Sequence, residues 1–285
     1  MRNLPPLNIP ALLRKYGLRP NKELGQNFLV DDSALQRVMD AAVVQPGEAV
    51  LEIGAGLGSL TRYLAAAAKQ VIAVELDDNL IPPLKEVLSS LTNVKIIHGD
   101  FLNLDPNKLL IIDNSQLPIT NYSVVANIPY YITSAIIRHL LEAEIKPQRL
   151  VLTVQHEVAM RVCAKPGKLS LLALSVQVYG EPQIVTNIPA AAFYPAPKVD
   201  SAVVRIDLFP DPLIPQPLIP IFFQLAKAGF GQKRKTLRNS LSAGMAWPKE
   251  KTARILEDAG IDPQRRAETL TLDEWNELVK QSLKE

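Results

Sequence analysis

Short apolar runs alternate with segments of helical length along the first half of the chain. Each run has the length and aliphatic character of a strand buried on both faces of a sheet. Five such runs come before residue 155, namely AVLEI at 49–53, VIAVE at 71–75, VKIIH at 94–98, YSVVAN at 122–127 and RLVLTV at 149–154. This alternation predicts βαβ units, and therefore a mostly parallel sheet covered by helices on both faces.

The pattern changes after residue 170. The runs LLALSVQVY at 171–179 and SAVVRIDLF at 201–209 have no convincing helix between them, so they predict an antiparallel hairpin that closes the sheet. Residues 209–220 contain five prolines and predict a stiff linker that is not helical. Only helical patterns follow. We therefore predict an α/β domain at residues 1–208, a linker at 209–220 and a small all-helical domain at 221–285.

The composition adds limits to this picture. At 285 residues the chain is long enough for two domains, and its 47% apolar and 21% charged residues are typical of a globular protein. No run approaches the roughly 18 apolar residues that cross a bilayer, and the first residues lack a signal-peptide core. The single cysteine cannot form an internal disulfide. These features predict a cytoplasmic protein without a membrane partner.

Positive charge is concentrated in two stretches, although the net charge is only +2. Residues 1–22 hold five basic residues and no acid, and residues 227–254 hold eight basic residues against Glu250 alone. Charges within about 8 Å of one another act together at physiological salt, so each stretch is able to bind phosphates. A solvated helix face is the alternative interpretation of both.

A glycine-rich turn follows the first strand in LEIGAGLGSLT, residues 51–61. Gly54, Gly56 and Gly58 let the backbone pass close to a ligand, and the next helix presents free N–H groups. Dehydrogenases have a similar turn, but they need the spacing G-x-G-x-x-G. The spacing E-x-G-x-G-x-G instead resembles the first motif of S-adenosylmethionine-dependent methyltransferases.

Carboxylates end three successive strands. Glu52 lies near the end of the first, Glu75 ends the second about 20 residues on, and Asp100 follows the third. Glu75 is placed to accept both ribose hydroxyls, and Asp100 to accept from an adenine amine while Phe101 packs on the ring. A single carboxylate at a strand end is more often a helix cap than a ligand-binding group. Three in register at the carboxyl ends of strands predict a nucleotide site.

The fourth strand ends in Asn127-Ile128-Pro129-Tyr130. The exocyclic amine of adenine is a poor nucleophile because its lone pair is delocalised into the ring. The side-chain oxygen of Asn127 and the carbonyl of Ile128 are able to accept its two N–H groups, and Tyr130 is able to stack on the base. A simple strand-ending turn with a core tyrosine is the alternative. The motif predicts methyl transfer to an adenine amine without a strong general base.

Taken together, these motifs resemble the bacterial 16S rRNA adenine dimethyltransferase family, the kasugamycin-resistance dimethyladenosine transferases. The resemblance covers nearly the whole chain. It is carried by LGQNFLVD at 24–31, LEIGAGLGSLT at 51–61, VELD at 74–77, GDFL at 99–102, NIPYYIT at 127–133, QHEVAMR at 155–161, FYPAPKVDSAVVR at 193–205 and GQKRKTLRNSL at 231–241. It implies a Rossmann-like S-adenosylmethionine-binding sheet with a small helical RNA-binding domain.

The resemblance also implies roles for individual residues. Its cofactor-binding positions are Asn27, Leu29, Gly54, Gly56, Glu75, Asp100 and Asn127. Phe193 matches an aromatic that packs on the target base opposite Tyr130. The basic side chains Lys233, Arg234, Lys235 and Arg238 match a surface that faces RNA phosphates.

The implied substrate is a pair of adjacent adenosines in the 3′-terminal hairpin loop of 16S rRNA, each methylated twice at N6 during small-subunit biogenesis. A loop suits this chemistry because its bases are already partly unstacked. We expect the protein to act on its rRNA as a monomer and without a metal ion, since none of the three histidines has the spaced partners that a metal site needs.

The chain departs from the family in two places. Residues 163–172 are shorter and lack the usual Tyr-Gly-Arg, and His156 stands where lysine is common. Both changes affect expected RNA contacts rather than the chemistry. Three alternatives remain: a related 23S rRNA methyltransferase of the antibiotic-resistance type, a ribosome-assembly factor that binds RNA without methylating it, and a dehydrogenase. A dehydrogenase would need an acid that handles hydride near the strand ends, and none is placed there.

Overall fold

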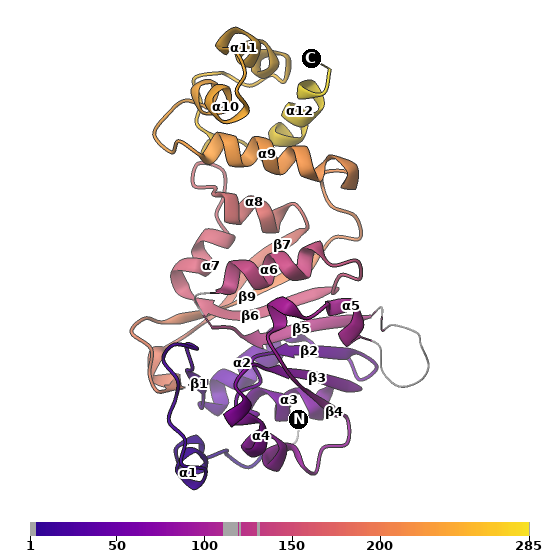
Figure 1. The fold of residues 1–285 in the computed structure, drawn as a ribbon, viewed down its shortest axis with the longest axis vertical. Helices are drawn as coiled ribbons and strands as arrows, with labels where there is room; N and C mark the ends of the chain where they lie inside the picture. The colour runs from indigo at the N-terminus through magenta and orange to yellow at the C-terminus, as the bar shows by residue number, and fades with distance from the viewer. Residues whose placement is uncertain (1–3, 111–118, 120, 130–131, 285) are drawn as a thin grey trace. The chain divides into compact units, whose positions relative to one another are not determined.

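The computed structural model describes residues 4–110, 119, 121–129 and 132–284. Figure 1 shows an α/β part followed by a bundle of helices at the C-terminal end of the chain. The residues form two compact units, the first comprising Met1–Ala159 with Gln183–Leu208, and the second comprising Met160–Pro182 with Phe209–Glu285. The domain boundaries that we drew at residues 208 and 221 stay predictions.

The first unit is organised by a seven-stranded sheet with the order β4-β3-β2-β5-β6-β9-β7. Neighbours among β4, β3, β2, β5 and β6 are parallel, and β9 pairs antiparallel with β6. The strands are β2 Ala49–Ile53, β3 Gln70–Glu75, β4 Val94–His98, β5 Tyr122–Asn127, β6 Arg149–Gln155, β7 Gly180–Ile188 and β9 Ser201–Leu208. The five strands predicted from the apolar runs are confirmed, and β2 is buried along its whole length.

Helices cover this sheet. Those that begin in the first unit are α1 Ile9–Lys15, α2 Asp32–Ala42, α3 Ser59–Ala67, α4 Ile81–Leu88, α5 Pro106–Leu109, α6 Thr133–Glu142 and α7 His156–Val162. Short 3₁₀ helices are η1 Asp78–Leu80, η2 Phe101–Asn103 and η5 Ala190–Ala192. α2, α3 and α4 share one core cluster with alternate residues of the strands, including Val50, Val71, Val125 and Val151. That alternation follows from the two-residue period of a strand.

Two predictions about the later chain are wrong. Residues 171–177 form the helix α8, Leu171–Gln177, because the hydroxyl of Ser170 accepts from the Ala173 N–H at 3.2 Å and caps it. The strand of this region is β7, which begins at Gly180. The proline-rich segment is also partly helical, with η6 at Gln216–Leu218 and the first turn of α9 at Ile219 and Pro220. Proline fits a first turn because its missing N–H has no partner there.

The second unit continues through α9 Ile219–Phe230, α10 Leu237–Met245, α11 Lys249–Asp258, η7 Ala267–Thr269 and α12 Leu272–Ser282. Trp275 is fully buried at its centre, with the ring of Phe230 stacked 6.1 Å away and that of Phe222 edge-on at 6.4 Å. A capping box between Thr271 and Glu274 begins α12. This unit therefore has its own aromatic core.

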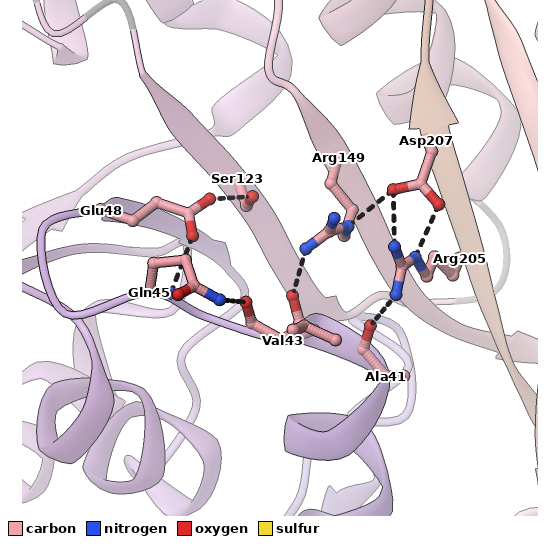
Figure 2. Close-up of polar contacts among 9 residues, drawn as sticks. Ala41, Val43, Gln45, Glu48, Ser123, Arg149, Arg205 and Asp207 are labelled. Atoms are coloured by element: carbon pink, nitrogen blue, oxygen red, sulfur yellow. Dashed lines mark hydrogen bonds and ion pairs between the residues drawn. The ribbon is translucent and has the colours of Figure 1, made fainter.

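Paired charges occupy the amino-terminal edge of the sheet (Figure 2). Arg149 and Arg205 both bond Asp207 at 2.7 Å, and they also donate to the carbonyls of Ala42 and Ala41 at the end of α2. Cations at the C-terminus of a helix oppose its negative end. We call Arg149, Arg205 and Asp207 the arginine clamp. It ties α2 to β6 and β9.

A second, two-stranded ladder joins distant parts of the first unit. β1, Phe28–Leu29, pairs antiparallel with β8, Phe193–Tyr194, so that Phe28 faces Tyr194 and Leu29 faces Phe193. The ladder brings the LGQNFLVD motif beside the FYPAPKVDS motif. Within the described part of the chain, no helix combines the length and the apolarity that crossing a bilayer requires.

Candidate active site

A hollow opens at the carboxyl ends of β2, β3, β4 and β5, where open α/β sheets bind ligands. It encloses about 1030 Å³, counted with the solvent space at its mouth. All seven predicted cofactor residues line it, namely Asn27, Leu29, Gly54, Gly56, Glu75, Asp100 and Asn127. The structure thus brings the predicted cofactor positions to one place.

The glycine turn forms the floor of this hollow. Gly54, Gly56 and Gly58 have φ angles of 77°, 59° and 84°, a region that side chains rarely adopt. A Cβ atom on Gly56 would also lie 3.1 Å from the ring of Phe28. Glycine is therefore required for the backbone shape and, at Gly56, for the close approach of the β1 segment.

Glu75 is buried at the end of β3, and burial raises the pKa of its carboxyl. Its two oxygens accept the N–H groups of Gly56 at 2.7 Å and of Asp77 at 2.8 Å. Each carboxylate oxygen has a second lone pair, so Glu75 is still able to accept two hydroxyls of a ribose. The bonds to the backbone fix its orientation for that task.

Asp100 is both a helix cap and part of the wall of the hollow. It caps η2 by accepting from the Leu102 N–H at 3.0 Å and from the Asn103 amide at 2.8 Å, and it lines the hollow. Phe101 lines the same wall and is held edge-on by the His139 ring, with 5.3 Å between the ring centroids. The backbone carbonyl of Leu104 lies 2.8 Å from Nε2 of His139. This packing gives a flat apolar wall suited to an adenine ring.

Asn127 ends β5 and is fixed by the β1 segment. Its amide nitrogen donates to the backbone carbonyl of Asn27 at 3.0 Å. The amide nitrogen already donates to Asn27, and the side-chain oxygen is left to accept a hydrogen bond from a ligand. The loop that carries Asn27 thus orients the amide at the tip of β5.

Glu52 is the first of the three predicted strand-end carboxylates, and the sequence assigned no ligand contact to it. It is 1% exposed, and its Oε2 atom has no hydrogen-bond partner among the described residues. Burial raises the pKa of the Glu52 carboxyl to about 8; a hydrogen bond with Thr61 opposes the rise, and the nearby negative charge of Glu75 adds to it. A buried polar atom without a partner costs free energy, so its presence in the wall of a hollow indicates a ligand, and a positively charged ligand would offset the cost. The signal in the sequence was an acid inside an otherwise apolar strand.

The remaining predicted site residues differ in whether the structure places them at the hollow. Ile128 is 1% exposed beside Asn127, and its backbone N–H donates to the carbonyl of Thr153 at 3.3 Å. Tyr130 lies outside the described residues. Phe193 is 3% exposed and belongs to the core cluster that α2, α3 and α4 share with the strands, so its predicted contact with a base stays a prediction. Phe28, which we did not predict, lines the hollow.

The predicted RNA-facing residues belong to the second unit. Lys233, Arg234 and Lys235 are exposed in the turn between α9 and α10, and Arg238 lies in the first turn of α10. Arg238 has a buried Nε atom without a hydrogen-bond partner among the described residues. Also within those residues, no three potential metal ligands gather at one place.

Comparisons with known proteins identify the chain's relatives. The family described as Ribosomal RNA adenine dimethylase matches residues 17–283. The chain belongs to the ribosomal RNA adenine dimethylase family. Among curated members, the Ribosomal RNA small subunit methyltransferase A of Dehalococcoides mccartyi strain CBDB1 is 46% identical over 268 residues, covering 94% of this chain and 90% of that protein. The protein of the same name from Alkaliphilus metalliredigens is 40% identical, covering 97% and 96%.

Solved structures agree with this dimethylase fold. The 23S rRNA methyltransferase ErmE has a TM-score of 0.71 at 29% identity, covering 90% of this chain and 99% of that one. A dimethyladenosine transferase from Plasmodium falciparum has a TM-score of 0.76 at 24% identity, covering 90% and 98%. The α/β Rossmann-like sheet with a helical C-terminal part is therefore the fold of the family, as predicted.

The hollow also fits the cofactor that the family resemblance implied. S-adenosylmethionine combines an adenine, a ribose and an amino acid with a positively charged sulfur. The hollow offers an aromatic wall at Phe101, a buried carboxylate at Glu75 and, at Glu52, a buried acid with one oxygen that has no hydrogen-bond partner among the described residues. An apolar surface with a few placed polar groups is typical of such sites.

Proposed function

We propose that this protein transfers methyl groups from S-adenosylmethionine to N6 of two adjacent adenosines in the 3′-terminal hairpin loop of 16S rRNA. The products are N6,N6-dimethyladenosines made during small-subunit biogenesis. Membership in the dimethylase family and curated relatives named for the small subunit support this choice of substrate. The contact between Asn127 and Asn27 at the tip of β5 is the observation that carries the chemistry.

The wall residues hold the cofactor in this proposal. Glu75 binds the ribose hydroxyls, Asp100 and Phe101 bind the adenine, and Gly54 and Gly56 let the backbone approach. Asn27 and Leu29 close the other side through the β1 segment. When bound, S-adenosylmethionine supplies a methyl group on a sulfonium, which is a good leaving group.

Asn127 prepares the nucleophile. Its free side-chain oxygen and the carbonyl of Ile128 accept the two N–H groups of the adenine amine, which draws the nitrogen away from planarity and frees its lone pair. No strong general base is needed, because the proton leaves to water after transfer. Hydrogen bonds fixed before the reaction cost little reorganisation, so the bond from Asn127 to Asn27 is part of the catalytic design.

The basic turn of the second unit binds RNA phosphates. Lys233, Arg234 and Lys235 are exposed, and Arg238 follows them in the first turn of α10. Such contacts bind RNA without reading its sequence. We further propose that the protein acts in the cytoplasm as a monomer, and that its reaction uses no metal ion.

The decisive experiment is a labelling assay. Purified protein is incubated with methyl-labelled S-adenosylmethionine and small ribosomal subunits that lack the modification, and the RNA is then mapped. We expect label in the two adjacent adenosines of the 3′-terminal hairpin, at up to two methyl groups each. Label confined to large-subunit RNA would favour the 23S type of enzyme, and binding without label would favour an assembly factor.

RNA binding by the basic turn is tested separately. Replacing Lys233, Arg234 and Lys235 by Ala removes up to three phosphate contacts, so the slope of log affinity against log salt should fall by about 2 for single-stranded RNA. Lys249→Ala, outside the turn, is the control and should change the slope by less than 1. An unchanged slope in the triple variant would mean that the turn is only a solvated surface.

A further inference from the structure

A cover segment, residues 24–29, borders the active-site hollow, and all of its residues line it. The carbonyl of Asn27 accepts the hydrogen bond from Asn127 at the end of β5. One residue earlier, the side-chain nitrogen of Gln26 donates to the carboxylate of Asp77 at 2.6 Å, two residues beyond the end of β3. β2 lies between β3 and β5 in the sheet. The cover segment therefore crosses the end of β2 and is bonded on both sides of it.

The amide of Gln26 has a fixed orientation. Its oxygen accepts the backbone N–H of Asn21 at 2.7 Å, and the backbone N–H of Gln26 donates to the carbonyl of Asn21 at 3.1 Å. A backbone N–H only donates, and the ionised carboxylate of Asp77 only accepts, so neither partner tolerates the amide turned over. Gln26 thus joins the turn before the cover segment to the strand that ends in Glu75.

Asp77 divides its two oxygens between separate tasks. One accepts the backbone N–H of Asn79 at 3.0 Å and caps η1, and the other accepts from Gln26. The backbone N–H of Asp77 in turn donates to Glu75, the acid that lines the hollow. The cap of η1 does not need Gln26. The second oxygen of Asp77 therefore serves the cover segment alone.

We propose that the hydrogen bond between Gln26 and Asp77 is a latch that keeps the cover segment over S-adenosylmethionine and keeps Asn27 in place to orient Asn127. The proposal rests on the proposed function, for which it names two positioning residues. A segment held in its bound shape before the ligand arrives loses less freedom on binding. Loss of the latch should therefore weaken cofactor binding. It should also lower kcat, because the amide that grips the adenine amine loses its fixed partner.

The test exchanges the acid and the amide in the full-length protein. Gln26→Glu places a carboxylate against a carboxylate. Asp77→Asn places an amide nitrogen against an amide nitrogen, because the cap of η1 holds the oxygen. Each change should weaken S-adenosylmethionine binding by about tenfold or more, measured by calorimetry without RNA, since each removes a hydrogen bond to a charged group. Each should also lower kcat on small subunits that lack the modification.

The double variant Gln26→Glu/Asp77→Asn decides the proposal. Its new amide donates to its new carboxylate, and the remaining oxygens still accept from Asn21 and Asn79. Cofactor affinity should therefore return to within about threefold of wild type, and kcat should recover with it. Losses that simply add in the double variant would overturn the proposal, because each residue would then act by itself.

A matched control is the bond from Gln36 to Asp40, an amide and a carboxylate 2.8 Å apart on the surface of α2. Gln36→Glu should leave cofactor affinity and kcat unchanged. Single variants at Gln26 and Asp77 that lose stability in urea but keep wild-type affinity would make the latch merely structural and overturn the proposal. Gln26→Met removes the bond without adding charge, and it replaces Gln26→Glu if that variant fails to fold.

The two proposals fail in different ways. If wild type binds the cofactor but transfers no methyl group to small subunits, the proposed function fails, while the calorimetric comparison still decides the latch. If transfer to the hairpin is observed and the double variant shows no recovery, only the latch fails.

Discussion

The two edges of the sheet satisfy their polar side chains to different degrees. At the amino edge, Arg149 and Arg205 share Asp207 and cap the carbonyls at the end of α2, and Glu48 is bonded to Ser123 and to the Gln45 N–H (Figure 2). At the carboxyl edge, Glu52 has an oxygen without a partner among the described residues. Both edges belong to the same strands.

This difference separates structural from functional polar groups. A buried charge whose partners all come from the chain contributes to the folded state alone. A buried acid with an unpartnered oxygen keeps its proton in the empty protein, because burial disfavours the charged form. A positively charged ligand beside it would favour the ionised form, so ligand binding and the ionisation of Glu52 should be coupled. Variants at the two edges should therefore separate stability from activity.

Asn127→Ala should give the largest effect. Removing a group that binds the reacting amine should lower kcat by about 10²–10³-fold, while the free energy of unfolding changes little. Asn93→Ala is the matched control at the amino edge, because Asn93 donates to the carbonyls of Ala65 and Ala68 at 2.9 and 3.1 Å. It should lose stability and keep kcat. Equal losses of kcat in both variants would mean that Asn127 acts only through the fold.

Glu52→Gln should change how stability depends on pH. Because the pKa of Glu52 is raised to about 8 from 4.5, the folded protein keeps a proton that the unfolded chain releases. The stability of the ligand-free protein should therefore fall as pH rises from about 5 to about 8, by an amount on the order of a few kcal/mol.

The glutamine is neutral throughout, so the variant should lose most of this slope, as measured by urea unfolding at several pH values. Exposed Glu23→Gln is the control and should keep the wild-type slope. Parallel pH profiles for wild type and Glu52→Gln would show that the acid is already satisfied in the empty protein.

Gly56→Ala should weaken cofactor binding by about tenfold or more. The new Cβ atom combines a strained φ of 59° with a contact of 3.1 Å to Phe28, which would push the β1 segment away from the hollow. Gly17→Ala has a similar φ of 65° but open space around it, so it isolates the cost of strain. It should cost about 1 kcal/mol of stability and leave the affinity unchanged. Calorimetry with S-adenosylmethionine measures the cofactor affinity of both variants, which should fall in Gly56→Ala and stay unchanged in Gly17→Ala.

Asp207→Asn should have the smallest effect, about 1 kcal/mol, because this carboxylate is partly exposed. Partial burial raises its pKa, but hydrogen bonds from Arg205 and Arg149 outweigh burial and lower the pKa below 3.8. The clamp therefore stabilises the protein above about pH 4, and its contribution is lost as pH falls below that value. Thermal unfolding should show this loss in wild type and not in the variant, while cofactor affinity stays unchanged. Exposed Asp211→Asn should leave both profiles intact.

Sequence patterns located the central strands well because those strands are buried on both faces, and burial demands continuous aliphatic runs. The same signal failed at 171–179, where a buried helix has an equally apolar sequence. There the capping serine before Leu171 carried the information that distinguishes a helix from a strand. A short apolar run does not reveal which backbone buries it.

The candidate site was predictable where a motif combines residue type with position at a strand end. Glu75, Asp100 and Asn127 all line one hollow for this reason. The sequence could not show which ring of the 193–194 pair is buried, because two adjacent aromatics look alike there and only the pairing with β1 buries Phe193 and leaves Tyr194 exposed. The orphan oxygen of Glu52 was equally invisible, since a missing hydrogen bond is a property of three-dimensional packing.

The β1–β8 ladder has a consequence for synthesis on the ribosome. One wall of the hollow is made near residue 28, but the strand that pairs with it arrives only at residue 193. A nascent chain halted before that point would contain the glycine turn, Asn127 and the β1 segment, but it would lack β8, the strand that pairs with β1. The nascent chain should therefore become able to bind S-adenosylmethionine only late in translation, after about two thirds of the polypeptide has been made.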